Sequence, residues 1–444
     1  MSDIIVKKFG GSSLADVGQF EKVLRILEVD PRRMYIVASA PGKRKGMEGD
    51  HKVTDLLLAL YGKYDRAKNT PKTVIVGMIR DRFLGIAQGL GLEVFEEDEF
   101  DILHTASDTF HDMDSIVALG EYWNGRILAK ARHVPFVDAK DVVKLNKDGM
   151  LDMNATLQSR ELLLNYKDGC VIPGFYGVMP NGTVKTFTRG GSDLSGTVVA
   201  RVVGAAECQL WSDVSGMLMT DPRIVPHAKP IRFLTYAEAG EMAYGGANVL
   251  HPETTFPVEE VDIPIRLLNT NQPDDEGTRI VPDHLAPERV PGSIVGIAGR
   301  QPFAVIGVKK PSMNSEVGFI HRVSGAFVRH DVNIEHMPGG IRTLNIIASK
   351  EQLNGKLSAV ISDIEWDCAP VEVLLHTDMA LICIVGRGMS HTPGVALLPL
   401  QALASVDVSV RMIDQDSNEL NIIIGVNVGD YETAVRAIYA AFVT

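Results

Sequence analysis

Cysteine is scarce in this sequence, and its spacing is not that of a metal or disulfide site. The four cysteines, Cys170, Cys208, Cys368 and Cys383, are scattered over 444 residues without a Cys-x-x-Cys pair. Such spacing indicates neither a zinc knuckle nor a disulfide framework. We therefore expect a reducing, cytoplasmic location.

Long apolar runs and a basic leader are also missing. No segment approaches about 18 uninterrupted apolar residues, and the start of the chain carries no positively charged stretch followed by an apolar one. We therefore expect neither secretion nor membrane insertion. The formal net charge of −12 disfavours a nucleic-acid partner, and the short basic run at residues 42–45 is interpreted as a solvated loop.

Two common nucleotide-binding sequences are absent as well. Neither the Gly-x4-Gly-Lys-Ser/Thr loop nor the Gly-x-Gly-x-x-Gly turn occurs. A P-loop and a dinucleotide fingerprint are therefore not expected, and any phosphate site must be built differently.

The length of the chain predicts more than one domain. Domains usually split beyond about 250–300 residues, whereas this chain has 444. Between Asn269 and Ser293 the composition turns to Asn, Gln, Asp, Gly and Pro with little periodicity. We place a boundary there and predict one domain over residues 1–285 and a second region over residues 286–444.

The first domain alternates short β-branched runs with helical stretches. This pattern is typical of an α/β fold with a largely parallel sheet sandwiched by helices. An amphipathic helix is expected over Asp114–Arg132, where apolar residues recur every three or four positions. The expected strands are Ile4–Phe9, Met34–Ser39, Val134–Asp138, Cys170–Pro173, Cys208–Ser212 and Ile263–Leu268.

The C-terminal region contains one pattern twice, at a constant offset of 76 positions. Gly318 recurs as Gly394, and Leu344-Asn345-Ile346-Ile347 recurs as Leu420-Asn421-Ile422-Ile423. The first copy is expected to form strand, helix, strand, strand and helix over Phe303–Val308, Val317–Arg329, Asn333–Met337, Thr343–Ala348 and Gln352–Ile361. This order predicts two ferredoxin-like βαββαβ domains, over about residues 294–368 and 369–444, whose open sheet edges favour association side by side.

Two glycine-rich turns carry the residues best suited to bind anions. The first follows the strand that contains Lys8, and the second includes Arg189 and precedes a helix over Leu194–Val203. Glycine lets the backbone approach an anion, and a helix start offers unpaired N–H groups. Each turn also has a purely structural explanation, as a tight turn capped by Ser13 and as a helix capped by Ser192 or Asp193.

The motifs resemble those of aspartokinases in both sequence and order. They are KFGGSS at residues 8–13, LGE at 119–121, FTRGGSD at 187–193, WSDVSG at 211–216 and VLHP at 249–252. The resemblance covers the whole chain, because the tandem repeat is similar to the paired ACT domains of that family. It implies an amino-acid kinase fold, with ATP, Mg²⁺ and L-aspartate as ligands.

The resemblance also implies a role for individual residues. Lys8 resembles the lysine that neutralises the transferring phosphoryl group, and Asp193 the carboxylate that holds this lysine. The residues implied to bind ATP are Lys8, Gly10, Gly11, Ser12, Gly190, Gly191, Ser192, Ser212, Asp213 and Arg223, and those implied to bind aspartate are Ser39, Thr54, Glu121 and Arg189. Because Mg²⁺ would bridge the phosphates, no dedicated protein cage for a metal is expected.

In the repeat, the resemblance implies an amino-acid effector site and a homodimer or higher oligomer. The implied effector residues are Met313, Glu316, Asn333, Ile334 and Glu335. The sequence does not decide whether the effector is lysine, threonine or both. Two departures, Asn248 and Leu218, put the contacts to adenine in doubt, and His251 is interpreted as a structural residue.

Two other functions remain open from the sequence alone. One is a kinase that acts on glutamate or acetylglutamate, because a shared fold does not define the substrate. The other is a regulatory protein that binds amino acids without catalysing a reaction, which the two departures would favour. The presence of Lys8, Arg189 and Asp193 argues against the second.

Overall fold

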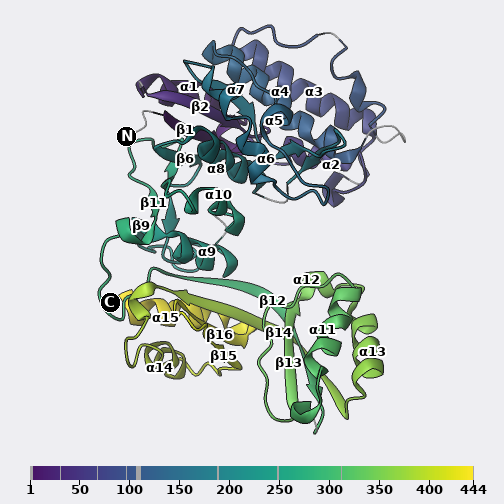
Figure 1. The fold of residues 1–444 in the computed structure, drawn as a ribbon, viewed down its shortest axis with the longest axis vertical. Coiled ribbons are helices and arrows are strands. Elements are labelled where there is room, and N and C mark those ends of the chain that lie inside the picture. The colour runs from purple at the N-terminus through teal and green to yellow at the C-terminus, as the bar shows by residue number, and fades with distance from the viewer. Residues whose placement is uncertain are drawn as a thin grey trace. The chain divides into compact units, whose positions relative to one another are not determined.

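The chain forms two compact units (Figure 1). The computed structural model describes residues 4–30, 32–67, 69–96, 98–106, 112–187, 190–247, 250–311 and 313–443. The first unit comprises Met1–Met217, Pro230–Gly240 and Asn248–Pro287, and the second Leu218–Lys229, Glu241–Ala247 and Glu288–Thr444. Within the described ranges, no helix has the length and apolar character needed to cross a bilayer.

A seven-stranded sheet forms the centre of the first unit, in the order β3-β2-β1-β6-β10-β11-β9. The first five strands in this order run parallel, β11 is antiparallel to β10, and β9 is parallel to β11. Their bounds are β3 Cys170–Pro173, β2 Arg33–Ala38, β1 Ile4–Phe9, β6 Glu207–Ser212, β10 Ile265–Asn269, β11 Thr278–Val281 and β9 Phe233–Thr235. The expected largely parallel sheet is confirmed.

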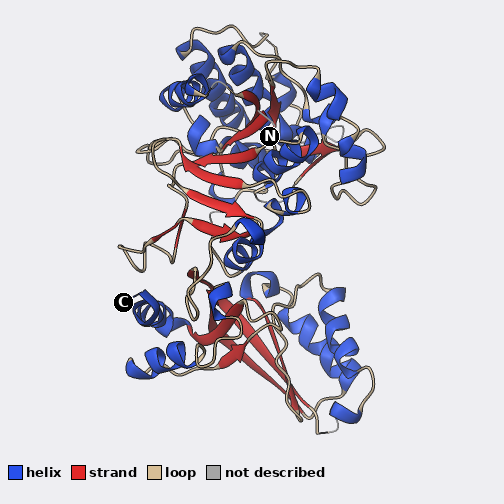
Figure 2. Ribbon diagram, turned by 60° about the vertical axis from the view of Figure 1, so that its left-hand side comes forward, coloured by secondary structure: helices blue, strands red, loops and turns tan. Residues whose placement is uncertain are grey.

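Helices cover both faces of this sheet (Figure 2). One face packs against α1 (Val17–Val29), α3 (Lys72–Gly89) and α4 (Met113–Arg132), through a core that includes Phe9, Phe20 and Trp123. The other face packs against α8 (Gly191–Val203). The shorter elements are α2 Val53–Ala59, α5 Ala139–Val142, α6 Met153–Leu157, α7 Arg160–Leu164, β4 Tyr176–Val178, β5 Val184–Thr186, β7 Met217–Leu218, β8 Pro230–Ile231, α9 Tyr236–Tyr244 and α10 Phe256–Glu259.

Two expected strands are wrong. Val134–Asp138 makes only an isolated bridge between Phe136 and Val171, because Pro135 has no N–H with which to extend the ladder. Asn333–Met337 likewise contributes only a bridge between His336 and Ile347. The chain stays beside β13 (Thr343–Ser349) as far as Gly340, but the pairing is interrupted at Pro338, which has no N–H, and so it remains a pair of isolated bridges.

The second unit contains one antiparallel five-stranded sheet, in the order β13-β12-β14-β16-β15. Its strands are β12 Gly296–Lys309, β13 Thr343–Ser349, β14 Glu372–Val385, β15 Met412–Asp414 and β16 Asn421–Asn427. The two central strands, β12 and β14, have 14 residues each and pass through both copies of the repeat (Figure 1). The expected association of the two copies side by side is confirmed, and it produces a single sheet.

Each copy of the repeat has its own apolar core. Phe319, Val323 and Ile364 belong to the first core, and Ile382 and Ile424 to the second. The helices of the first copy are α11 Phe319–Arg329, α12 Lys350–Leu353 and α13 Leu357–Cys368, and those of the second are α14 Leu397–Ser405 and α15 Tyr431–Val443. The start of β12 packs in the second core through Ile297, whereas its end packs in the first core through Ile306. The first strand of the region is therefore shared by both copies.

Candidate active site

The first glycine turn lies where β1 ends, beside the end of β6. The N–H of Gly10 donates to the carbonyl of Trp211 at 2.9 Å, and the Ser12 hydroxyl donates to the Asp213 carboxylate at 3.1 Å. A Cβ atom at Gly11 would lie only 2.8 Å from the Ala40 carbonyl, so no other residue fits there. The turn is thus fixed between the chain segments that follow β2 and β6.

Lys8 is buried, with 6% of its surface exposed, and it forms an ion pair with Asp193. Its Nζ atom lies 2.5 Å from Oδ1 of Asp193, which is in the first turn of α8. Gly196, one turn further along α8, brings the helix close to β1, since a Cβ there would be 3.1 Å from Cβ of Lys8. Positions three apart on a helix share a face, so α8 presents Asp193 and Gly196 to the same strand.

The second glycine turn begins α8 in a way that the sequence did not predict. The N-cap is Gly190, whose φ of 83° favours glycine, and no side chain of the described residues caps the helix. The alternative explanation of this turn, a helix capped by Ser192 or Asp193, is therefore wrong, and both side chains face other partners. Ser192 Oγ accepts a hydrogen bond from Ser39 Oγ at 2.8 Å, which joins the start of α8 to the end of β2.

Glu121 is fully buried on α4, beside the same group of turns. Burial raises the pKa of Glu121 to about 8, although a hydrogen bond from the N–H of Ala40 and the charge of Lys8 act in the opposite direction. No described residue hydrogen-bonds Oε2 of this carboxyl group. The next turn of α4 supports the site as well, because Asn124 donates to the carbonyl of Ser39 at 2.7 Å. Glu121 therefore presents an unpaired oxygen beside Ser39 and Ala40.

The remaining predicted residues are divided between the two units. Thr54 lies at the start of α2, a helix that packs against α4. Ser212 accepts from the N–H of Val214 at 3.3 Å and holds the turn after β6. Arg223 lies in the second unit, 82% exposed and paired with Asp221. Arg189 and Asn248 lie outside the described residues.

A buried ion pair that sequence reasoning missed supports the first glycine turn. Arg82 on α3 donates to the carbonyl of Gly42 at 2.8 Å and to the Asp50 carboxylate at 2.5 Å. The N–H of Gly42 in turn donates to the carbonyl of Gly11 at 2.8 Å. Arg44 also pairs with Asp50, so the interpretation of residues 42–45 as a solvated loop is wrong for this residue. The available signal was the position of Arg82, three residues after Ile79 and four before Ile86, on the apolar face of α3.

The predicted effector residues lie in the first copy of the repeat. Glu335 accepts from Arg300 at 2.6 Å and from the Tyr244 hydroxyl at 2.8 Å. Glu316 pairs with Lys310 at 2.5 Å and with Arg322. The remaining three are Met313, which is buried, Asn333, whose N–H donates to Gln352, and Ile334, which packs against the first core. Both carboxylates therefore already have partners within the second unit.

Residues 3–269 match the amino acid kinase family, and residues 382–442 match an ACT domain. The chain is 34% identical to aspartokinase 3 from Bacillus subtilis (strain 168), over 98% of both chains. Among solved structures, the aspartate kinase from Clostridium acetobutylicum is 40% identical, with a TM-score of 0.83 over 99% of both chains.

Aspartokinase III from E. coli is 25% identical and has been solved in two states. Its complex with aspartate and ADP has a TM-score of 0.83, over 99% of this chain and 100% of that one. Its complex with lysine and aspartate has a TM-score of 0.75, over 100% of both chains.

Proposed function

The chain belongs to the aspartokinases, within the amino acid kinase family, and we propose that it transfers the γ-phosphoryl group of ATP to the side-chain carboxylate of L-aspartate. The products would be ADP and 4-phospho-L-aspartate. The observation that carries this proposal is the buried pair of Lys8 and Asp193, beside two glycine turns at one end of a parallel sheet. Ligands of open α/β sheets bind at this end.

Phosphoryl transfer requires mainly positioning and the stabilisation of negative charge. We propose that the ammonium group of Lys8 stabilises the negative charge of the transferring phosphoryl group, and that Asp193 orients this ammonium group through the 2.5 Å contact. We assign the backbone N–H groups of Gly11, Ser12 and residues 190–192 to the phosphates. Gly10, whose N–H donates to Trp211, is proposed to let the nucleotide approach closely because it has no side chain. Ser212, Asp213 and Arg223 are proposed to contact the rest of the nucleotide.

Aspartate is proposed to bind between α4 and the ends of β1 and β2. The unpaired oxygen of Glu121 suits an α-ammonium group, because a buried carboxylate without a partner favours a cationic ligand. Ser39, Thr54 and Arg189 are proposed as further contacts, with the arginine on a substrate carboxylate. An ionised carboxylate needs no proton removed before it attacks, so the proposal assigns no general base.

Mg²⁺ is proposed to accompany ATP and to neutralise charge on its phosphates. The donor set suits this ion, because the Asp213 carboxylate lies beside the Ser12 hydroxyl at the mouth of the first turn. Carboxylate and hydroxyl oxygens are ligands that Mg²⁺ accepts, directly or through water.

We further propose that the second unit senses lysine, threonine or both, and that the reaction is the first step toward lysine, threonine and methionine. The ACT match and the lysine complex of the E. coli relative support this regulation. The same proposal includes a kinase domain over residues 1–285 and a regulatory region over residues 286–444. It also includes assembly as a homodimer or higher oligomer and a cytoplasmic location.

Trapping the acyl phosphate with hydroxylamine tests the reaction directly. Purified protein with Mg·ATP should form a hydroxamate with L-aspartate, and far less with glutamate or acetylglutamate. A preference for either of the latter would make the chain a different carboxylate kinase. Calorimetry with an ATP analogue tests the other alternative, since a regulatory protein without catalysis would bind lysine or threonine but no nucleotide.

A further inference from the structure

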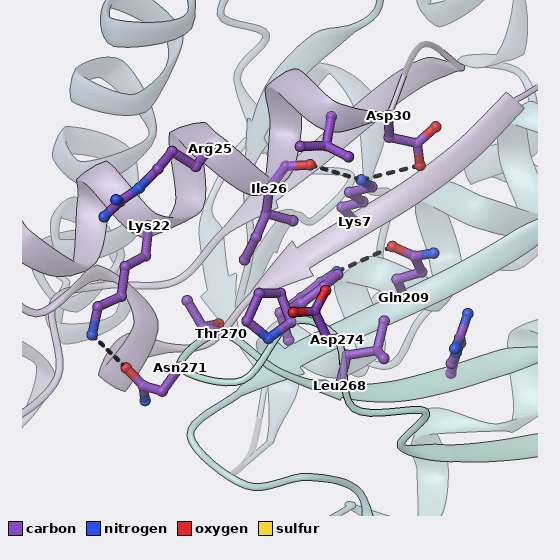
Figure 3. Close-up of a pocket in the computed structure, with 14 residues that line it drawn as sticks. Lys7, Lys22, Arg25, Ile26, Asp30, Gln209, Leu268, Thr270, Asn271 and Asp274 are labelled. Carbon is purple, nitrogen blue, oxygen red and sulfur yellow. Dashed lines mark hydrogen bonds and ion pairs between the residues drawn. The ribbon is translucent and has the colours of Figure 1, made fainter.

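A cavity of about 480 Å³ lies on the face of the first unit's sheet that is turned away from the Lys8 ammonium group (Figure 3). Side chains alternate between the two faces of a strand. Lys8 points toward α8, where it meets Asp193, whereas Lys7 points toward α1, where it donates to the carbonyl of Ile26. The cavity is therefore separate from the proposed site for ATP and aspartate.

Three neighbouring strands build the floor of this cavity. The register pairs Gln209 of β6 with both Lys7 of β1 and Arg266 of β10, and Trp211 of β6 with Leu268 of β10. Trp211 and Leu268 are 5% and 3% exposed. The indole is held in place, because its N–H donates to Gln209 at 3.1 Å and its ring stacks on Phe9 with 6.0 Å between centroids. The floor is thus fixed, and it exposes the edges of Trp211 and Leu268 beside the polar side chains of Gln209 and Arg266.

Three cations at the walls of the cavity have no carboxylate partner among the described residues. Lys22 donates to the side-chain oxygen of Asn271 at 2.8 Å, which is a neutral group. Arg25 and Arg266 donate only to the backbone carbonyls of Glu21 and Glu276. All three therefore retain positive charge that is not compensated by a neighbouring carboxylate.

The acidic residues of the lining do not cancel this charge. Asp30 is engaged by Lys7 at 3.2 Å and by Arg32 at 2.8 Å. Among the described residues of the lining, Asp274 is the only other carboxylate, and it contacts no cation. The cavity is thus locally positive, although the whole chain carries a formal charge of −12. Such a contrast favours a negatively charged occupant.

We propose that this cavity binds a small organic anion, in which a carboxylate, sulfonate or phosphate group is attached to a flat apolar body. The charged group would lie against Lys22, Arg25 and Arg266, and the body against the apolar lining, which comprises Ile26, Val29, Trp211, Leu268 and Pro273. The volume is in the range of about 300–1,000 Å³ that is usual for small-molecule sites. This assignment does not depend on the kinase reaction.

The dye 8-anilinonaphthalene-1-sulfonate is a suitable probe, because it is a flat aromatic sulfonate whose fluorescence rises in apolar surroundings. Titration of the full chain should give saturable binding of one dye, with energy transfer from tryptophan. The charge reversals Lys22→Glu and Arg25→Glu together should weaken binding by roughly tenfold or more, because they remove two charge-assisted contacts. Lys167→Glu is the matched control, since Lys167 is exposed and lies outside the lining.

Competition separates the contributions of charge and of the apolar floor. Phenyl phosphate should displace the dye at lower concentration than inorganic phosphate. Equal displacement by the two would overturn the proposed ligand class. Binding that is unchanged in the Lys22 and Arg25 variant would overturn the proposed site. Circular dichroism and thermal melting establish that each variant is folded.

Discussion

Lys8 and Asp193 are 185 positions apart in the sequence, yet their charged atoms lie 2.5 Å from each other. If Lys8 stabilises the transferring phosphoryl group, Lys8→Met should lower kcat by about 10²–10³-fold or more, as the loss of one preorganised charge usually does. Hydroxamate formation from aspartate measures this, and thermal melting shows whether the variant is folded. Lys167→Met, which changes an exposed lysine, should keep full activity. A folded Lys8→Met variant with normal turnover would remove Lys8 from its proposed role.

Glu121 should make the folded protein less stable as the pH rises, which is the opposite of the usual effect of a carboxyl group. Burial raises its pKa from 4.5 to about 8, so the folded state binds the proton more tightly than the unfolded state. This contribution to stability is complete below pH 4.5 and is lost as the pH rises to about 8. Glu121→Gln should therefore become more stable relative to the natural protein across this window. Urea denaturation at several pH values measures the difference, and the exposed Glu28→Gln should show no such trend.

The same carboxyl group should make aspartate binding dependent on pH. An ionised Glu121 attracts an ammonium group, and ionisation rises as the pH passes about 8. KM for aspartate should therefore fall as the pH rises from about 6.5 to about 8.5. In Glu121→Gln, KM should be high and should lose this dependence. An unchanged pH profile in the variant would show that Glu121 does not contact the ammonium group.

Arg82 and Asp50 form a buried ion pair that holds Gly42 against Gly11. Arg82→Met leaves the Asp50 carboxylate paired with Arg44 alone and removes the hydrogen bond to the Gly42 carbonyl, so it should cost about 1–3 kcal/mol of unfolding free energy. Arg80→Met is the matched control, because Arg80 is exposed on the same helix and its loss should be nearly neutral. KM for ATP should rise in Arg82→Met, since the first glycine turn loses a support. Equal stability of the two variants would contradict this account.

Asp50 should also contribute to the acid sensitivity of the protein. Burial alone would raise its pKa, but hydrogen bonds from Arg44 and the charge of Arg82 prevail and lower it from 3.8 to about 2. The resulting stability is present above pH 3.8 and is lost as the pH falls toward about 2. In Asp50→Asn this component of acid unfolding should be absent. Fluorescence-detected unfolding between about pH 5 and pH 2 measures it, and identical acid transitions would contradict the prediction.

The second unit carries exposed apolar side chains on two neighbouring helices. Trp366 on α13 is 88% exposed and Val328 on α11 is 77% exposed. If the protein is a dimer through this region, Trp366→Asp should place a charge in the interface and shift the protein toward monomer. Light scattering coupled to gel filtration measures the mass. Met150→Asp, at an exposed apolar site in the first unit, should leave the mass unchanged. A dimer that survives Trp366→Asp would exclude this surface.

The sequence predicted those parts of the fold that local pattern determines. The strand over Ile4–Phe9 has the expected bounds, because its β-branched residues lie between recognisable turns. The extent of β12 was missed, since Gly296–Gln301 becomes strand only through pairing with the distant end of β14. Arg82 and Asp50 were missed for a similar reason, because their contact depends on how α3 packs. The motifs predicted the pair of Lys8 and Asp193. The helix-start pattern alone, in contrast, suggested that Asp193 could cap α8, whereas in the structure this residue pairs with Lys8 on β1.

Two continuous strands, β12 and β14, run through both C-terminal cores. A shift of one residue in the pairing of the two strands would turn apolar side chains outward in both copies at once. Such a change of register would therefore destabilise both cores. Neither copy can be excised or exchanged for a homologous module without cutting the sheet of the other. The duplicated halves should therefore unfold together, as one cooperative unit.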